Sequence, residues 1–339
     1  MKTTLSPLAR VAFVAAFGVA AVALCHAQDD SFEAEGEVQC SAMEAGVTNT
    51  YSSQFHATVS GSTTLIRTRL QTSDPDSIAD YYEYYSQGSN STLLIRLPDD
   101  LMVTNITTTS GGVEKTVKLK TPQRSWNQAT IFVRPDPLPP YGFEHLTAVW
   151  LAFGSRSHFP ATGQGAVDPV VFIEKGFRES QRKTESQWTV EAVPPGLLEF
   201  MAEFSDGKTY EPGGKATPKR LPAPFDTGFT NAFFRTLEWT NVMGLRFPRK
   251  FELVKLQPDL ASPTEKKLTI AYRMVGEAHS YIVGKPRTNL ASIFPKRSQV
   301  IDYRYPDAGS RTEYSTYTFS APEGKVLSAQ QLLNGERSP

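Results

Sequence analysis

Cysteine is nearly absent from this 339-residue chain, which contains only Cys25 and Cys40. Cys25 lies in an N-terminal segment that we expect to be removed, so Cys40 would remain alone. A lone cysteine cannot form an internal disulfide, and the fold must then depend on its core. We interpret Cys40 as a half-buried strand residue; the alternative is a reactive thiol.

Motifs for catalysis or metal binding are also lacking. The sequence has no G-x-S-x-G elbow, Walker loop, C-x-x-C or H-E-x-x-H. Asp99 and Asp100 are adjacent and are interpreted as a turn, because a carboxylate pair for acid–base catalysis usually converges from separate elements. The histidines show no metal-ligand spacing: His26, His56, His145, His158 and His279. We therefore expect no cofactor, no metal and no enzymatic activity.

Charge of one sign is not in excess, since the formal net charge is +0. Binding to nucleic acid is therefore not expected. The charge is uneven along the chain, with an acidic segment at 28–100 and a basic one at 201–300. We expect the two segments to lie side by side and offset each other; the alternative is that the basic segment attracts anionic lipid.

The chain has one long apolar run, from Val11 to Cys25, preceded by Lys2 and Arg10. A charged start, a short apolar core and the small-residue exit at Ala27 predict a secretory signal peptide over residues 1–27. A retained anchor is the alternative, although a membrane span takes about 17–25 residues. Lipidation of Cys25 is a further alternative, disfavoured by the bulky Leu24. The protein is thus expected in the periplasm or cell envelope of a Gram-negative-type bacterium.

Period-two alternation dominates the rest of the sequence and predicts antiparallel hairpins. In "FHATVSGSTTLIRTRL", Gly61 is expected at the turn, with Ile66 and Thr68 on one face and Arg67 and Arg69 on the other. Similar hairpins are predicted at 81–98, 102–120, 197–211 and 300–319, and a short helix at 328–335. The tyrosines of "YYEYY" at 81–85 should divide between the two faces of their strand; binding of sugars is the alternative.

Residues 136–186 interrupt this pattern and predict a helical insertion. Prolines precede "GFEHLTAVWLAFGS", where apolar residues recur at helical spacing. A second short helix is predicted from Asp168, with Asp168 as N-cap and Pro169 at the first position. The fold class is therefore α+β and mostly antiparallel β: one domain over 28–339, with meanders at 28–135 and 187–339 forming a large curved sheet or half-barrel covered by the insertion.

The stretch "EWTNVMGLRFPRKFEL" at 238–253 has an apolar approach, a turn ending at Gly244, and Pro248 before a second apolar segment. It resembles a hairpin of periplasmic lipoprotein-carrier proteins of the LolA/LolB type. "FSDGKTYE", with Asp206 and Gly207 at the turn, and the hairpin around Gly61 are similar to units of the same proteins. The chain also resembles uncharacterised exported bacterial proteins of this plan.

This resemblance implies an incomplete antiparallel barrel, covered by short helices, with a cavity for acyl chains. In such carriers an arginine on an early strand helps to hold the helical lid, which implies Arg67 or Arg69 here. The chain differs from the carriers in being longer and in having its helices in the middle.

The leading hypothesis is a non-enzymatic envelope protein that binds a lipid, a lipoprotein acyl chain or another apolar ligand. Helix 142–154 would be the lid. A structural scaffold that binds another envelope protein is the first alternative, and a hydrolase with carboxylates converging from distant strands is the second. The predicted cavity residues are Phe143, Leu146, Val149, Trp150, Phe153, Arg67 and Arg69.

Overall fold

The computed structural model describes residues 31–335 apart from several gaps. Side chains at 101–122 and 168–188 also lie outside the description. The predicted signal peptide, Cys25, Asp99, Asp100, His158 and Asp206 are therefore not covered. The gaps are residues 45–46, 72–80, 97–100, 111–112, 123–128, 136, 140–141, 156–167, 175–179, 189–196, 206, 210–218, 261–264, 287–288, 296, 305–314 and 321–326.

Most of the described chain is β-strand, as the alternation predicts. The first strands are β1 (Ser31–Glu44), β2 (Val47–Ser60), β3 (Thr63–Gln71), β4 (Tyr81–Gln87), β5 (Asn90–Arg96), β6 (Leu101–Ser110), β7 (Val113–Pro122) and β8 (Ala129–Arg134). The later strands are β9 (Asp168–Glu174), β10 (Ser180–Trp188), β11 (Leu198–Ser205), β12 (Lys208–Thr209), β13 (Lys219–Arg220), β14 (Phe229–Val242), β15 (Leu245–Pro258), β16 (Leu268–Val283), β17 (Arg297–Asp302) and β18 (Ser315–Ser320).

Helices occupy little of the described chain. The α-helix α2 (Glu144–Val149) continues directly into the π-helix η1 (Trp150–Gly154). A 3-10 turn, η3 (Phe225–Thr227), precedes β14, and α3 (Ala329–Leu333) lies near the C-terminus. The predicted helices at 142–154 and 328–335 are confirmed. Ser328 and Gln331 form a capping box at the start of α3, which explains why that helix begins there.

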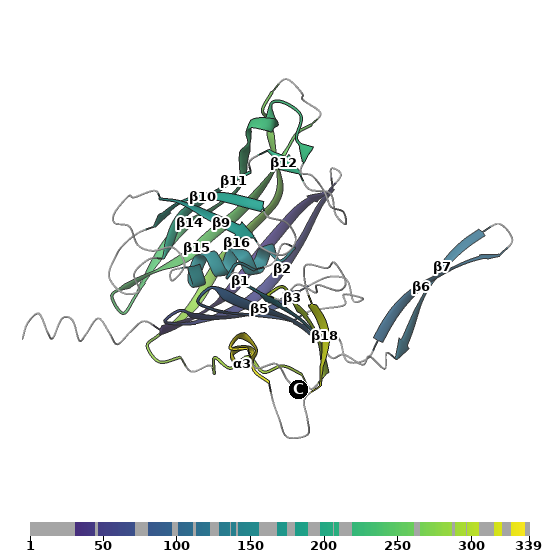
Figure 1. Cartoon of the computed structure of the whole chain (residues 1–339), viewed down its shortest axis with the longest axis horizontal. Helices are drawn as coiled ribbons and strands as arrows, with labels where there is room; N and C mark the ends of the chain where they lie inside the picture. Colours follow the sequence, from purple (N-terminus) through teal and green to yellow (C-terminus); the bar gives the residue numbers. More distant parts are fainter. Residues whose placement is uncertain are drawn as a thin grey trace, which may run out of the picture.

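One fourteen-stranded sheet holds the molecule together, in the order β18-β17-β8-β5-β4-β3-β2-β1-β16-β15-β14-β11-β10-β9. Its neighbouring strands are antiparallel except for β17 and β8, which are parallel. The sheet curves around the helix α2–η1, the teal helix at the centre of Figure 1. The predicted mostly antiparallel half-barrel with a short helical part is confirmed. β6 and β7 form a separate two-stranded sheet, as do β12 and β13.

The two predicted chain halves meet at the centre of this sheet. β1 pairs with β16 over most of its length, from Phe32 opposite Val283 to Ala42 opposite Tyr272. The acidic and basic segments therefore lie side by side, as expected from their opposite charge.

Glycines on the concave face make room for aromatic rings from neighbouring strands. Gly36 is opposite Phe55, and Gly276 is opposite Phe251. A Cβ on Gly276 would lie 2.2 Å from the Phe251 ring, so a larger residue would displace it. Rings packed over cross-strand glycines are a device for building curved sheets.

Both faces of the sheet are covered by apolar clusters. The concave cluster includes Phe32, Phe55 and Phe251 together with the buried residues of α2 and η1. The outer cluster joins Leu65 and Tyr85 to residues of the C-terminal segment. The division follows from period-two alternation, because successive residues of a strand point to opposite faces.

Two predicted elements are wrong. Residues from Asp168 form strand β9, paired with β10, and not a second helix. The β-branched run after Pro169 suits a strand, and pairing with β10 satisfies its backbone there. The helical part of the 136–186 insertion is therefore α2–η1 alone among the described residues. The predicted hairpin at Gly207 is also wrong, because β11 pairs with β14 and β10, whereas β12 pairs with β13.

Candidate functional site

The predicted lid helix lies inside the curved sheet, with its apolar side chains against the strands. Leu146, Val149 and Phe153 are 0% exposed and Trp150 is 1% exposed, while Phe143 is half-buried at the start of the helix. All five belong to the concave cluster or pack against it. The structure thus brings together the five predicted helical residues.

Phe153 anchors the helix among the rings of the sheet. Its centroid lies 5.6 Å from that of Phe251, 5.8 Å from Phe55 and 6.2 Å from Phe32. Edge-to-face and tilted arrangements at such distances are the favourable ones for aromatic pairs. Gly154 lets the helix approach β3, because a Cβ there would be 2.8 Å from Thr64.

The start of the helix carries a buried ion pair. Lys255 Nζ, from β15, donates to Glu144 Oε1 at 3.0 Å. Burial alone would raise the pKa of the Glu144 carboxyl, but the Lys255 ammonium outweighs it and the pKa is lowered below its usual value. The pair fixes the first turn of α2 to the sheet.

His145 is buried beside this ion pair without a polar partner. It is 3% exposed, and among the described residues neither ring nitrogen has a hydrogen bond. The rings of Tyr82, Tyr51 and Phe143 surround it, with centroids 5.4, 6.4 and 6.5 Å away. Burial lowers the pKa of His145 to about 4, so the imidazole is neutral at pH 7. It offers one donor and one acceptor.

Cys40 and Tyr51 complete this cluster from the sheet. The two side chains are hydrogen-bonded, and burial raises the pKa of the Cys40 thiol to about 12. A thiol at such a pKa stays protonated and is a poor nucleophile. Cys40 is thus a buried strand residue, and burial likewise raises the pKa of Tyr51.

We call Cys40, Tyr51, Glu144, His145 and Lys255 the polar cluster. Its members come from β1, β2, α2 and β15. The sequence predicts a strand position for Cys40 and no metal-ligand spacing for His145, and it provides no signal for the other three residues. No sequence motif could have revealed the cluster, because strands distant in sequence meet there.

Arg67 and Arg69 lie on the other face of the sheet, away from the helix. Arg67 pairs with Glu83 through Nε and Oε2 at 2.8 Å, and Tyr81 donates to the same oxygen at 2.9 Å. Ser292 of the C-terminal segment also donates to Glu83. Burial by itself would lower the pKa of Arg67, but Glu83 raises it above its ordinary value. Neither arginine holds the helix.

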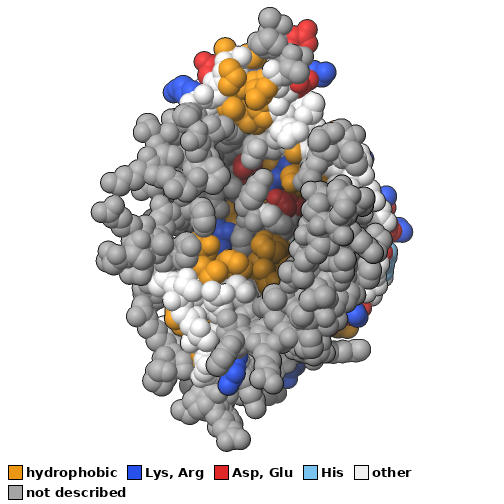
Figure 2. Space-filling view, turned by 90° about the vertical axis from the view of Figure 1, so that its right-hand side faces the viewer, with side chains coloured by type: hydrophobic (Ala, Val, Ile, Leu, Met, Phe, Trp, Pro, Cys, Tyr) orange, Lys and Arg blue, Asp and Glu red, His pale blue; other side chains and the backbone are white. Residues whose placement is uncertain are grey.

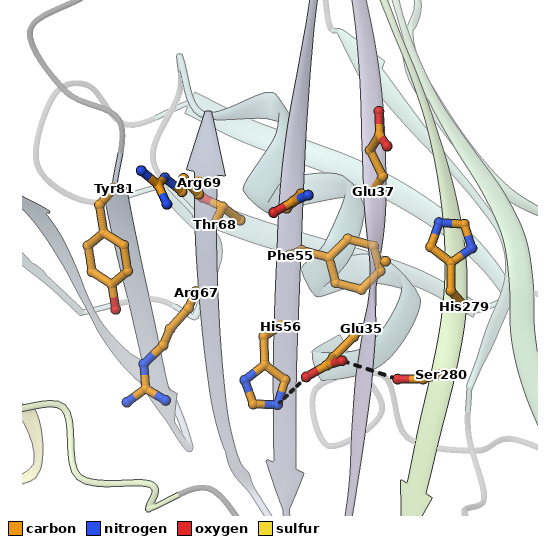
Figure 3. A pocket seen from close by; sticks show the side chains of 12 residues that line it. Glu35, Glu37, Phe55, His56, Arg67, Thr68, Arg69, Tyr81, His279 and Ser280 are labelled. Atoms are coloured by element: carbon orange, nitrogen blue, oxygen red, sulfur yellow. Dashed lines mark hydrogen bonds and ion pairs between the residues drawn. The ribbon is translucent and has the colours of Figure 1, made fainter. Parts of the chain in front are cut away.

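Both arginines instead line a hollow of about 810 Å³ on the outer face. Its other walls carry acids, histidines and a tyrosine, as Figure 3 shows. The lining includes Glu35, Glu37, Gln54, His56, Tyr81, His279 and Ser280. We call it the outer hollow.

Figure 2 shows one face of the molecule with a recess in which hydrophobic side chains lie next to acidic and basic ones. In the described part of the chain, no group of three or more His, Cys, Asp or Glu side chains has a metal-binding arrangement. Nor does any helix of that part have the length and hydropathy needed to span a membrane.

No protein-family model matches the sequence, and no curated protein matches it. Among solved structures, the chain is similar to a DUF1329 family protein from Desulfovibrio piger. The identity is 7% over 81% of this chain and 94% of that one, with a TM-score of 0.35.

The chain is also similar to two other solved structures. One is a LolA superfamily protein from Nitrosomonas europaea, with 9% identity and a TM-score of 0.30. The other is a putative outer membrane lipoprotein-sorting protein domain from Vibrio parahaemolyticus, with 8% identity and a TM-score of 0.31. Each alignment covers 77% of this chain and 88% of the other. The LolA-like resemblance is confirmed as a resemblance.

Proposed function

We propose that this protein is a non-enzymatic component of the periplasm or cell envelope of a Gram-negative-type bacterium. It binds a lipid or another apolar ligand between the concave face of the sheet and the helix α2–η1. The ligand enters by displacing part of the helix, because the helix now fills that face.

The supporting observation is that the apolar lining of the concave face extends beyond the buried core. Half-buried apolar side chains pack against the concave cluster and continue its surface toward solvent. They come from the sheet and from the segment before the helix: Tyr51, Tyr82, Ile95, Phe132, Leu138, Phe143, Trp239, Val242, Leu245, Tyr272, Tyr281 and Val283. A continuous apolar surface of this kind suits an acyl chain, since each buried methylene contributes about 0.8 kcal/mol.

The helix has features suited to a movable cover. The helix consists of two short segments, α2 and η1. The second segment is a π-helix, a form that is rare and often found at functional sites. The first turn of the helix is held by the Glu144–Lys255 pair, which can exchange for water or for a ligand's polar group. Opening would therefore break one ion pair and also expose the apolar side chains of the helix, which are now buried against the sheet.

The polar cluster supplies a place for the polar end of an amphiphile. His145 has a donor and an acceptor without partners among the described residues, and leaving such groups buried costs about 1–3 kcal/mol. A hydroxyl or amide group of a ligand would satisfy one of the two ring nitrogens. The ligand chain would then run along the apolar face toward Phe153.

The same residues argue against catalysis. Cys40 is protonated, and His145 has no hydrogen-bonded side chain that it could activate among the described residues. In the outer hollow, Glu35 and Glu37 lie two apart on one strand and therefore point the same way. A hydrolase would need two carboxylates on facing walls of a cleft, whereas Glu37 and its cross-strand neighbour Glu277 lie side by side on one face of the sheet.

A fluorescence titration tests the proposal. The mature chain 28–339 is titrated with dansylaminoundecanoic acid, and unlabelled lipids then compete with the probe. The variant Phe143→Ser should weaken binding about tenfold, since 1.4 kcal/mol corresponds to that factor. Leu260→Ser is the control, because Leu260 is 56% exposed and outside the concave cluster. An absence of probe binding, or an equal effect of both variants, would refute the proposal.

A further inference from the structure

The polar cluster at the start of the helix favours one class of head group on the lipid. His145 is 3% exposed, and within the described residues neither of its ring nitrogens has a hydrogen-bond partner. Most buried polar side-chain atoms in proteins have such a partner. A group of the bound ligand can therefore supply a partner that the described residues do not supply.

His145 lies only one layer of side chains below the surface. The rings of Tyr82, Tyr51 and Phe143 that surround it are all half-buried. Tyr51 is held by its hydrogen bond to Cys40, whereas the side chain of Phe143 has no polar atom. Rotation of the Phe143 ring would therefore admit a head group to the imidazole without breaking a side-chain hydrogen bond.

The charges of the polar cluster balance each other. Glu144 and Lys255 form an ion pair at 3.0 Å, and their side chains are 6% and 17% exposed. Burial is the main cause of the raised pKa values of Cys40 and Tyr51, and the negative charge of Glu144 adds to it in both. Cys40, Tyr51 and His145 are therefore uncharged at pH 7. The cluster as a whole then contains one carboxylate, one ammonium and no net charge.

A charged head group would disturb this balance. A carboxylate or phosphate could bind Lys255 only by leaving Glu144 buried without its partner, and an ammonium could bind Glu144 only at the expense of Lys255. A buried ion without a partner is strongly unfavourable. An uncharged hydroxyl leaves the ion pair intact. It also both donates and accepts, so it can pair with either nitrogen of the neutral imidazole.

We propose that the ligand is an uncharged lipid with a hydroxyl group at its polar end, and that this hydroxyl forms a hydrogen bond with His145. Fatty alcohols, monoacylglycerols and diacylglycerols have such an end, whereas fatty acids and phospholipids carry charge at theirs. The apolar chain runs from Phe143 toward Phe153 along the concave face. This inference rests on the function proposed above and adds the chemical class of the ligand to it.

A competition titration tests the preference for a hydroxyl. The competitors are 1-decanol, decanoate and 1-chlorodecane, which have chains of the same length, and each is used to displace the dansyl probe from the mature chain 28–339. Decanol should displace the probe at a concentration at least tenfold lower than decanoate. 1-Chlorodecane is uncharged and more apolar than decanol but cannot donate a hydrogen bond. It therefore separates hydrogen bonding from a general preference for apolar molecules.

Two substitutions test the role of His145 in this preference. His145→Leu removes both ring nitrogens and should weaken the binding of decanol at least tenfold relative to that of 1-chlorodecane. His145→Gln retains a donor and an acceptor and should keep the preference of the unaltered chain. His279→Leu is the control, because His279 is exposed and outside the concave cluster. Its affinities for all three competitors should be unchanged.

The results distinguish this inference from the proposed function. If the probe binds but decanol and decanoate displace it equally well, the hydroxyl preference is wrong and the lipid site stands. The same conclusion follows if His145→Leu weakens decanol and 1-chlorodecane equally, or if decanol binds His145→Gln no better than His145→Leu. If the probe does not bind the unaltered chain, both proposals are wrong.

Discussion

His145 is a neutral imidazole surrounded by aromatic rings. Its burial makes the stability of the protein decrease at acidic pH. Its pKa is lowered from 6.5 to about 4 in the folded protein. The unfolded chain binds more protons between these values, so stability is full above pH 6.5 and decreases as the pH falls toward 4. By pH 4 the free energy of unfolding has decreased by about 3 kcal/mol, since one pKa unit corresponds to about 1.4 kcal/mol.

The variant His145→Leu should remove this part of the pH dependence. We expect its free energy of unfolding to decrease less between pH 6.5 and pH 4 than that of the unaltered chain, as measured by urea denaturation. At pH 7 it should be at least as stable, because two unpartnered nitrogens are replaced by apolar atoms. His279→Leu is the control, since His279 is exposed. An unchanged pH slope in His145→Leu would contradict the assigned burial.

Gly36 is required by a close contact between two strands at the centre of the sheet. A Cβ at this position would lie 2.1 Å from the carbonyl oxygen of Glu277 and 2.8 Å from the Phe55 ring. Gly36→Ala should therefore reduce the free energy of unfolding by about 3 kcal/mol, the upper end of typical overpacking costs. Gly61→Ala is a useful comparison, because nothing lies within 4 Å of its Cβ. It should cost only about 1–2 kcal/mol through its positive φ. Equal costs would argue against the contact at Gly36.

At the scale of elements, the Glu144–Lys255 pair adds to the apolar packing that holds α2 against the sheet. Lys255→Met would leave the Glu144 carboxylate buried without its partner, which should cost about 3 kcal/mol or more. The double variant Glu144→Gln/Lys255→Met should recover most of that loss, because neither charge is then buried. Guanidinium denaturation measures both effects. Lys250→Met on the same strand is the control and should change stability by less than about 0.5 kcal/mol. A double variant no more stable than Lys255→Met would show that the pair does not fix the helix.

The sequence contained enough local information for many elements. Gly61 and Gly244 adopt positive φ at turns where hairpins were predicted, and helix 142–154 was evident from its apolar spacing. Pro248 did not end β15, because the paired strand β14 is irregular around Glu238 and accommodates it. Asp168 and Pro169 begin a strand, although the same two residues commonly begin helices. Pairing with β10 favours the strand over the helix, and no local sequence pattern predicts that pairing.

Gly207 shows a second limit of local reasoning. It has a φ of 76°, which fits the predicted Asp-Gly turn. However, a Cβ there would lie 2.3 Å from the carbonyl oxygen of Phe225, so the glycine also permits close packing against η3. Strand β11 then pairs with strands elsewhere in the sheet. A turn residue predicts a change of direction but does not identify the partner strand.

At the scale of the whole molecule, the two-sided core explains which site residues were predictable. The tyrosines of β4 divide between the faces as expected, with Tyr84 in the concave cluster and Tyr85 in the outer one. The same alternation places Arg67 opposite to Ile66, on the outer face. The sequence could not show that the helix covers one face and the C-terminal segment the other. The polar cluster and the outer hollow depend on that arrangement.

The central claim is that the concave face holds an apolar ligand, and mass spectrometry of carried small molecules tests it most directly. The mature chain, residues 28–339, would be purified gently from an exporting host and its bound molecules extracted. We predict an apolar molecule or lipid in stoichiometric amount, and a lower occupancy in Phe143→Ser. A protein that is empty, and remains empty after incubation with envelope lipids, would contradict the account.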